Sequence, residues 1–338
     1  MKRREDGDNL SSLFLRGMEF KRIEKKYSEE MMKLWNHEFK NDYPLTIELI
    51  NRNIFDCTNF DMESSICVFH DQRLAGFLIG KVWNEHYAIK TYESIGWLSL
   101  IYVHPEYRNR GIGTRMYNQF VTKMKEYGKN TIMVGKDPNN FFPGIPKEMK
   151  QHYQWFERRG FELHRDTYDL MRKINDGSEM IKLPDNPYQI QYMNESTFKQ
   201  TIHFMEKNFP GRWTFELIDY IHKGGSGREY LLLIHQNTVI GFCRINDFDT
   251  KIINYNMTWK SLFSKPGGIG PLGIDEAYRK HKLGYYVVAY ATNELIKRKV
   301  SDIVIDWTSL ISFYEKFGFS IWKTYRYAQF SLTDSKNV

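Results

Sequence analysis

The stretch Leu98-Ser-Leu-Ile-Tyr-Val-His-Pro-Glu-Tyr-Arg-Asn-Arg-Gly-Ile-Gly-Thr114 decides how the rest of the chain is interpreted. Its apolar half predicts a strand ending at Val103, and its basic, glycine-containing half predicts a loop that opens a helix. The first amides of a helix have no partner within the helix, and its dipole is positive there, so this end attracts phosphate. Gly111 and Gly113 let the backbone approach a ligand closely. The stretch therefore predicts an anion site.

The spacing Val-x-Pro-x-x-Arg-x-x-Gly-x-Gly resembles the acetyl-CoA pyrophosphate loop of the GCN5-related N-acetyltransferases, the GNAT family. It is not a Walker A loop, because no Gly-Lys-Ser/Thr follows, and the third glycine of a dinucleotide loop is missing. The resemblance implies that the strand backbone holds the pantetheine arm and that the loop amides hold the pyrophosphate. The residues so implied are Ile101, Tyr102, Val103, Arg108, Asn109, Arg110, Gly111, Ile112, Gly113 and Thr114.

The composition of the chain limits the classes of protein to which it can belong. A chain of 338 residues favours two domains. A net charge of +7 suits an anionic ligand and also permits weak, salt-sensitive nucleic-acid binding. The three scattered cysteines show neither zinc spacing nor a disulfide framework, so we expect no metal and a reducing cytoplasm. No apolar run reaches membrane-spanning length. Residues 1–17 are expected to form a loose tail.

The pattern of strands and helices over residues 18–175 has the order β-α-α-β-β-β-α-β-α-β, which is the order of a GNAT domain. After a polar connection at 175–187, the same order returns over residues 188–335. Tyr107-Arg108 matches Tyr278-Arg279, and the segment 156–161 matches 314–319. The fold class is therefore α/β with a mixed sheet, in two tandem GNAT-type domains.

The two copies differ in one loop. The loop arginine and the later glycine are separated by 52 residues in the first copy (160 − 108) and by 39 in the second (318 − 279). The turn-rich segment Lys136–Pro146 accounts for the difference and is interpreted as an insertion. Its aromatic residues, Phe141 and Phe142, are expected to cover an acceptor molecule, because long loops in compact domains are often functional.

The copies have also lost different motif residues. In the second copy Lys282 stands where Gly111 stands in the first, and the resemblance implies that Ile274, Arg279 and Gly284 take part in cofactor binding there. The resemblance further implies a tyrosine general acid four residues before a Gly-Phe pair, which is Tyr314. The first copy has Phe156 at this position, and phenylalanine cannot donate a proton.

A general base is less clearly marked. Asp306 ends a predicted strand facing the helix of Tyr314, so it is the favoured candidate beside His104, Asp137, His152 and Asp275. Each of these residues could instead be a turn, capping or surface residue. GNAT enzymes often use a water chain for this step, so a missing base would decide nothing.

The leading hypothesis is an N-acetyltransferase that moves an acetyl group from acetyl-CoA to a primary amine of a small molecule, by direct attack on the thioester and without a metal. The intact loop favours the first copy as the cofactor domain, and the second copy either catalyses or shapes the acceptor cleft. We expect a cytoplasmic monomer or homodimer. The alternative is a CoA-binding regulatory protein without turnover, because neither copy has both the intact loop and the tyrosine. We expect no nucleic-acid partner, because the aromatic residues are spaced as core residues and the sequence contains no known nucleic-acid-binding module.

Overall fold

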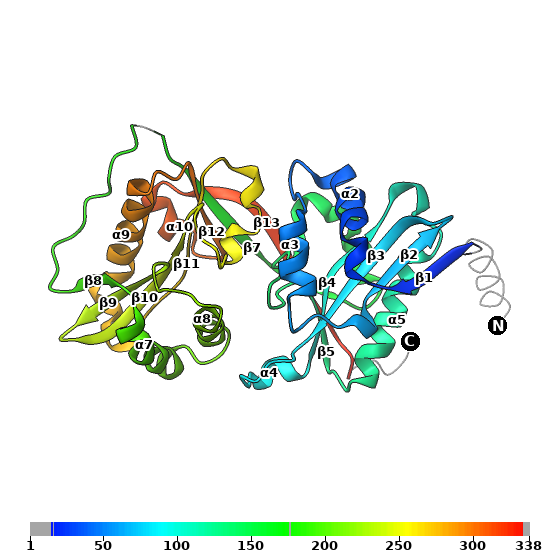
Figure 1. The fold of residues 1–338 in the computed structure, drawn as a ribbon, viewed down its shortest axis with the longest axis horizontal. Coiled ribbons are helices and arrows are strands. Elements are labelled where there is room, and N and C mark those ends of the chain that lie inside the picture. The colour runs from blue at the N-terminus through cyan, green and yellow to red at the C-terminus, as the bar shows by residue number, and fades with distance from the viewer. Residues whose placement is uncertain (1–14, 16, 176, 334–338) are drawn as a thin grey trace. The chain divides into compact units, whose positions relative to one another are not determined.

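The computed structural model describes residues 15, 17–175 and 177–333 (Figure 1). The tail predicted at 1–17 lies outside the described residues, apart from Leu15 and Gly17. The chain divides into two compact units. The first unit contains the described residues up to His86, residues Lys90–Asp166 and the chain from Tyr325 onward; the second contains Tyr87–Ile89 and Thr167–Thr324.

The sheet of the first unit is mixed. Its strands follow the order β1 (Met18–Arg22), β2 (Ile66–His70), β3 (Arg73–Val82), β4 (Ile95–Val103), β5 (Thr131–Val134) and the part of β13 (Ser320–Ser331) that begins at Tyr325; β6 (Ile145–Pro146) also pairs with β13. β4 and β5 run parallel, and the other strand pairs named here are antiparallel. The helices are α2 (Ser28–Phe39), α3 (Ile47–Ile50), α4 (Lys90–Glu93), α5 (Ile112–Glu126) and α6 (Tyr153–Glu157).

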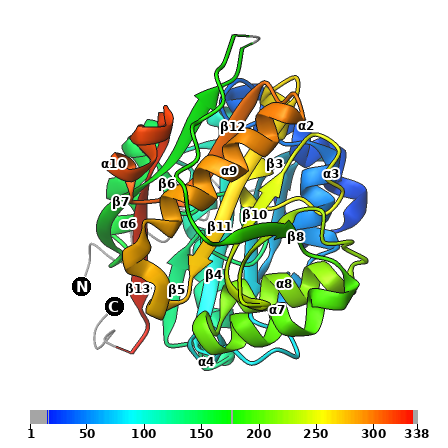
Figure 2. The ribbon, with the colours of Figure 1, turned by 90° about the vertical axis from the view of Figure 1, so that its left-hand side faces the viewer.

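The second unit repeats this plan. Its strands follow the order β8 (Gln189–Tyr192), β9 (Tyr230–His235), β10 (Thr238–Asn246), β11 (Pro266–Ile274), β12 (Asp302–Thr308) and the part of β7 (Glu162–Lys173) that begins at Thr167. Its helices are α7 (Glu195–Asn208), α8 (Arg212–His222), α9 (Leu283–Lys297) and α10 (Ile311–Tyr314). The parallel pair is β11 and β12, and α9 packs on β10 and β11 (Figure 2). The predicted mixed sheet with helices in two tandem copies is confirmed.

Each sheet is completed by a strand from the other half of the sequence. In the first unit β5 pairs with β13, with Met133 opposite Gln329. In the second unit β12 pairs with β7, with Ile303 opposite Arg172. The compact units therefore exchange the last strand of each sequence copy, and their limits differ from the copies at 18–175 and 188–335. Either strand can satisfy the same backbone hydrogen bonds, so the sequence pattern cannot distinguish the two arrangements.

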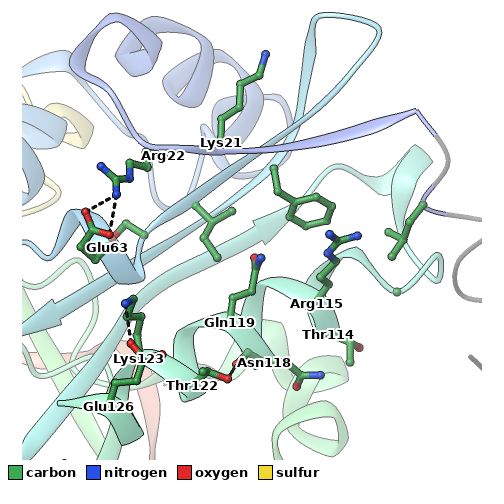
Figure 3. A pocket seen from close by; sticks show the side chains of 15 residues that line it. Lys21, Arg22, Glu63, Thr114, Arg115, Asn118, Gln119, Thr122, Lys123 and Glu126 are labelled. Carbon is green, nitrogen blue, oxygen red and sulfur yellow. Dashed lines mark hydrogen bonds and ion pairs between the residues drawn. The ribbon is translucent and has the colours of Figure 1, made fainter.

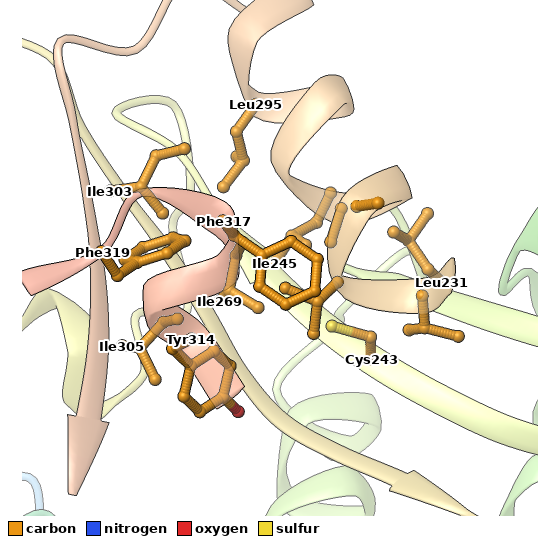
Figure 4. Packing of buried hydrophobic residues seen from close by; sticks show 14 of the residues in the cluster. Leu231, Cys243, Ile245, Ile269, Leu295, Ile303, Ile305, Tyr314, Phe317 and Phe319 are labelled. Atoms are coloured by element: carbon orange, nitrogen blue, oxygen red, sulfur yellow. The ribbon is translucent and has the colours of Figure 1, made fainter. Parts of the chain in front are cut away.

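The core of the second unit lies between α9, α10 and the sheet. Helix α9 buries eight of its residues, so it is apolar over most of its circumference. Figure 4 shows Leu295, Ile303 and Phe317 packed together in this core, with Tyr314 at its edge beside Ile305. This packing fixes the short helix that carries Tyr314.

Within the described part of the chain, no helix has the length and apolarity needed to cross a membrane.

Candidate active site

In both units the parallel strand pair separates just before a bulge in the central strand. The pairing of β4 with β5 ends at Leu98 and Val134, and the pairing of β11 with β12 ends at Gly268 and Val304. A β-bulge follows in each case: Ser99 has no counterpart in β3, and Gly270-Pro271 lies opposite a single residue of β10. Bulges of this kind occur beside active sites, where they separate strands and redirect side chains. We call each of these places the splay of its unit.

The residues beyond the bulge are those implied for the pantetheine arm. Ile101, Tyr102 and Val103 pair with β3 along one edge and lie past the end of the β5 pairing. In the second unit Ile274 pairs with Gly241 of β10 and also lies past the end of the β12 pairing. Each unit therefore brings a strand edge and a helix N-terminus to its splay.

The two splays can be matched residue by residue. Arg108 and Arg279 are 171 residues apart (279 − 108), and each donates from Nε to the carbonyl at the end of its central strand, Val103 at 2.8 Å and Ile274 at 3.3 Å. The same offset pairs Ser99 with Gly270 and Gly135 with Asp306. It also pairs Lys136 with Trp307, and both have positive φ, 63° and 48°. The first unit therefore has a glycine where the second has Asp306.

The predicted phosphate loop has the same backbone in both units. Gly111 precedes α5 with φ of 82°, and Lys282 precedes α9 with φ of 56°, so both adopt the left-handed conformation. A Cβ on Gly111 would meet nothing within 4 Å. Lys282 therefore preserves the shape of the loop, at a conformational cost that glycine avoids, and adds a positive charge to it. Gly113 and Gly284 occupy matching places in the first helical turns.

The Arg108 side chain is held by contacts within its own unit. Its guanidinium pairs with Glu38, which also accepts a hydrogen bond from the Tyr102 hydroxyl at 3.1 Å. Burial and the Glu38 charge raise the pKa of Tyr102. These contacts tie the loop to the end of β4. Of the remaining loop residues, Asn109 adopts a positive φ of 62° and Arg110 lies over the Tyr107 ring.

Arg159 is a residue at this loop that the sequence reasoning missed. It donates to Thr114 Oγ1 at 2.6 Å and stacks on Trp155 at 3.6 Å. It therefore places a cation at the first turn of α5. The sequence does offer a signal for this residue. Arg159 directly precedes the Gly160-Phe161 pair, and the second copy has the apolar Phe317 at the matching position.

The splay of the first unit is filled by its own side chains. Asp137 accepts from Lys81 Nζ at 2.6 Å and from Ser99 Oγ at 2.7 Å, and both members of the ion pair are 0% exposed. Phe141 and Phe142 are 1% and 4% exposed. The expectation that these aromatic residues cover an acceptor is therefore wrong, because the inserted loop packs into the core. Asp137 is committed to an internal ion pair.

The other base candidates lie in different settings. His104 Nδ1 is buried without a hydrogen-bond partner among the described residues, and the His104 ring lies 5.4 Å from that of His37. Burial and the Arg108 charge lower the pKa of His152. Asp275 accepts from the backbone of Ala277 at 2.9 Å, which is a capping contact.

The splay of the second unit carries Asp306, and Tyr314 packs beside Ile305, the neighbour of Asp306 on β12 (Figure 4). Asp306 as a whole residue is partly exposed, but the protein around its carboxyl group excludes water from it. This desolvation, with the charges of Asp169 and Glu216, raises the pKa of Asp306 to about 7. Tyr314 is 6% exposed, and burial, with the charge of Asp306, raises its pKa. Its hydroxyl points away from Phe317 and Phe319 (Figure 4). This arrangement pairs a carboxyl group that ionises near neutral pH with a phenol that keeps its proton.

The surroundings of Asp306 are polar and come from distant parts of the sequence. Glu216 of α8 accepts from Arg212 at 2.7 Å, and Arg212 lies over the Trp307 ring. Asp169 accepts from the Trp307 amide at 2.9 Å and belongs to β7, the strand supplied by the first sequence copy. Among the described residues no group of three or more His, Cys, Asp or Glu side chains is arranged to hold a metal ion.

A groove of about 890 Å³ lies between β1, β2 and α5 in the first unit (Figure 3). Gly111 and Thr114 reach one end of it, and the ion pairs Arg22–Glu63 and Lys123–Glu126 line the other. Apart from Gly111 and Thr114 of the loop, the residues described above at the splay of the first unit do not line this groove.

Comparison with known proteins identifies the family. The model of the acetyltransferase (GNAT) family matches residues 21–142 and 195–319. No curated protein sequence matches the chain.

Three solved structures resemble the fold over 93% of this chain. One is the GCN5-related glucosamine N-acetyltransferase region of a fungal multi-domain β-N-acetylglucosaminidase, with 21% identity and a TM-score of 0.82; this chain spans only 38% of its length. A GCN5-related N-acetyltransferase from Sphaerobacter thermophilus has 14% identity and a TM-score of 0.69, and the match covers 95% of that chain. A tandem GNAT protein from the clavulanic acid biosynthesis pathway has 12% identity and a TM-score of 0.65, and the match covers 98% of that chain. The chain belongs to the GNAT acetyltransferase family and carries two copies of its domain in tandem.

Proposed function

We propose that the protein transfers an acetyl group from acetyl-CoA to a primary amine of a small molecule, and that the reaction takes place at the splay of the second unit. The observation that carries the proposal is that Asp306 borders the bulge at Gly270 and that Tyr314 packs beside Ile305 of the same strand. Asp306 can accept a proton and Tyr314 can donate one, and amine acylation requires both. The first unit has Gly135 and Phe156 at the matching positions and lacks both groups.

The residues that would hold acetyl-CoA in the second unit are the backbone near Ile274 and the loop from Arg279 to Gly284, with Lys282 adding charge near the phosphates. Bound acetyl-CoA supplies the thioester that the amine attacks. Asp306 accepts the proton that the attacking nitrogen loses, directly or through water, as the C–N bond forms. Tyr314 donates its proton to the sulfur as the C–S bond breaks.

The first unit is suited to binding without turnover. Its loop is complete, and Arg159 adds a cation beside Thr114, which supports a site for the phosphates of a CoA molecule. The Lys81–Asp137 pair fills its splay, and Phe156 cannot act as an acid. We propose that the first unit is a CoA-binding copy and that catalysis belongs to the second.

An amino sugar is the acceptor class that we propose. Asp169, Glu216 and Asp306 favour a cationic molecule. Asn254 and Asn256, which both donate to the Gly270 carbonyl, place amide groups suited to hydroxyls at the same bulge. The description of one compared structure as a glucosamine N-acetyltransferase region supports this choice.

The test is turnover with acetyl-CoA and a panel of amines: glucosamine, spermidine and lysine. Free thiol release reports the rate, and mass spectrometry identifies the acetylated product. We expect glucosamine to react fastest, and N-acetylglucosamine, which has no free amine, to release no thiol above the hydrolysis rate. If no amine accelerates thiol release, the proposed function is wrong.

The pH dependence of the reaction should report Asp306. A carboxyl group accepts a proton only when it is ionised, so kcat/KM should rise from pH 6 to pH 8 with a midpoint near pH 7. In Asp306→Asn the remaining activity should lose this rise. An unchanged profile in Asp306→Asn would assign the ionisation to another group.

Gly111→Asp should remove acetyl-CoA from the first unit. Aspartate tolerates a positive φ, so the loop can still form, but its carboxylate repels the phosphates. Titration calorimetry should show at least a tenfold weaker site, which corresponds to about 1.4 kcal/mol. Gly111→Lys is the matched control, because it copies Lys282 of the second unit and should retain binding. Unchanged affinity and stoichiometry in Gly111→Asp would place acetyl-CoA in the second unit alone.

A further inference from the structure

Lys81 and Asn246 occupy the same place in the two units. Lys81 of β3 lies opposite Trp97, and Asn246 of β10 lies opposite Gly268. Trp97 and Gly268 are related by the offset of 171 residues that relates the two loops. Both side chains therefore start from matching strand positions, two residues before the bulge on the partner strand.

In the first unit this place is a complete binding site for a primary ammonium. Lys81 Nζ is 2.6 Å from Asp137 Oδ2, 3.0 Å from the carbonyl oxygen of Pro138 and 2.9 Å from that of Asn139. An ammonium has three N–H donors, so each one has an acceptor here. The Lys81 side chain is 0% exposed, and Ser99 Oγ at the bulge donates to the same carboxylate oxygen, Asp137 Oδ2, at 2.7 Å. The first unit thus binds an amine of its own.

In the second unit the matching residue lacks an amine and leaves an acceptor unpaired. Asn246 is 0% exposed; its Nδ2 donates to Asn256 Oδ1 at 3.0 Å, and its Oδ1 has no hydrogen-bond partner among the described residues. A buried acceptor without a donor is costly, which indicates that a donor from outside the protein completes it. Asn256 Nδ2 also reaches the Gly270 carbonyl, at 3.1 Å.

Asp306 borders the same bulge. A Cβ built on Gly270 would lie 3.8 Å from Asp306 Oδ1 and 4.0 Å from Asn256 Nδ2. The carboxylate of the second unit and the buried asparagine pair therefore meet at Gly270, as Asp137 and Lys81 meet beside Ser99 in the first unit. The inserted loop that supplies the two carbonyl acceptors for Lys81 has no counterpart in the second unit, so the acceptors there are side chains.

We propose that Asn246 is a specificity-determining residue, whose Oδ1 accepts from the amine of the acceptor, and that this amine takes the place that Lys81 Nζ takes in the first unit. Lys81 Nζ then occupies in the first unit the place that the acceptor amine takes in the second, so no acceptor amine can bind there. The proposal deepens the proposed function and rests on its assignment of the acceptor to the second unit.

The test is Asn246→Lys, which transplants the internal amine of the first unit. With glucosamine as the probe, the added ammonium should compete for Asp306 and raise KM at least tenfold, while the calorimetric affinity for acetyl-CoA stays unchanged. Asn246→Ala adds no atoms and keeps the proposal testable if the lysine variant fails to fold. It should raise KM several-fold with little change in kcat, the pattern of lost uniform binding. Asn118→Lys, on the exposed face of α5, is the control for added charge. It should leave the KM for glucosamine and the affinity for acetyl-CoA unchanged.

Binding of glucosamine without acetyl-CoA separates this proposal from the proposed function. If the wild-type protein binds glucosamine and Asn246→Lys and Asn246→Ala bind it at least several-fold more weakly, the proposal holds, even if no acetyl transfer is detected and the proposed function fails. If all three proteins bind it equally, or if the wild type does not bind it, the proposal is overturned, whatever the turnover assay shows.

Discussion

Tyr314→Phe is expected to lower kcat for acetyl transfer by about 100-fold or more, because general acid catalysis contributes roughly 10²–10⁴. The thiolate of CoA is a poor leaving group without a proton, and the raised pKa of Tyr314 keeps that proton in place across the neutral range. The KM for acetyl-CoA should change little, since the hydroxyl acts only as the C–S bond breaks.

The substitution is well suited to its purpose because it removes a single oxygen atom. Tyr314 packs its ring against Phe313 at 5.0 Å and Phe319 at 6.2 Å, and phenylalanine keeps both contacts. The first unit carries Phe156 at the matching position, buried in the same kind of helix. Thermal unfolding should therefore be nearly unchanged. Tyr286→Phe, on α9, is the matched control for loss of a phenol and should keep its kcat. A wild-type kcat in Tyr314→Phe would reduce Tyr314 to a core residue.

The parts of this site that sequence could predict are those encoded by short-range spacing. The loop around Gly111, the position of Tyr314 before its Gly-Phe pair and the place of Asp306 near the end of its strand each depend on neighbours within a few residues. The strand itself continues past Asp306 to Thr308. The loop backbone illustrates this: Lys282 takes the left-handed conformation of Gly111 although the side chain differs. The order of strands and helices in each copy follows from hydrophobic periodicity in the same way.

The parts that sequence could not predict depend on partners far apart in the chain. The raised pKa of Asp306 needs Asp169 from β7 and Glu216 from α8, and Asp169 reaches it only because the units exchange strands. Lys81 ends a strand pattern in which a lysine normally faces solvent, so its pairing with Asp137 gives no local signal. The burial of Phe141 and Phe142 follows from that pairing, because it draws the inserted loop into the core.

The Lys81–Asp137 pair gives the second large expected effect. Lys81→Met should lower the free energy of unfolding by about 3–5 kcal/mol, because it leaves a buried carboxylate without its counter-charge. Methionine is close to lysine in length and shape, so lost packing contributes little to this cost. The free energy is measured by urea unfolding followed by tryptophan fluorescence. Lys123→Met is the matched control: it breaks the exposed pair with Glu126 and should cost at most about 1 kcal/mol.

The double variant Lys81→Met/Asp137→Asn separates the charge from the fold. Replacing both members of a buried ion pair is often far less costly than removing one, so the double variant should recover much of the lost stability. The asparagine can still accept from Ser99, which keeps the loop in register. If Lys81→Met lowers the free energy of unfolding no more than Lys123→Met does, then water or another group reaches Asp137. In that case the splay of the first unit is open to solvent. A large cost that the double variant relieves shows that the Lys81–Asp137 pair is shielded from water and that its two charges depend on each other inside the first unit.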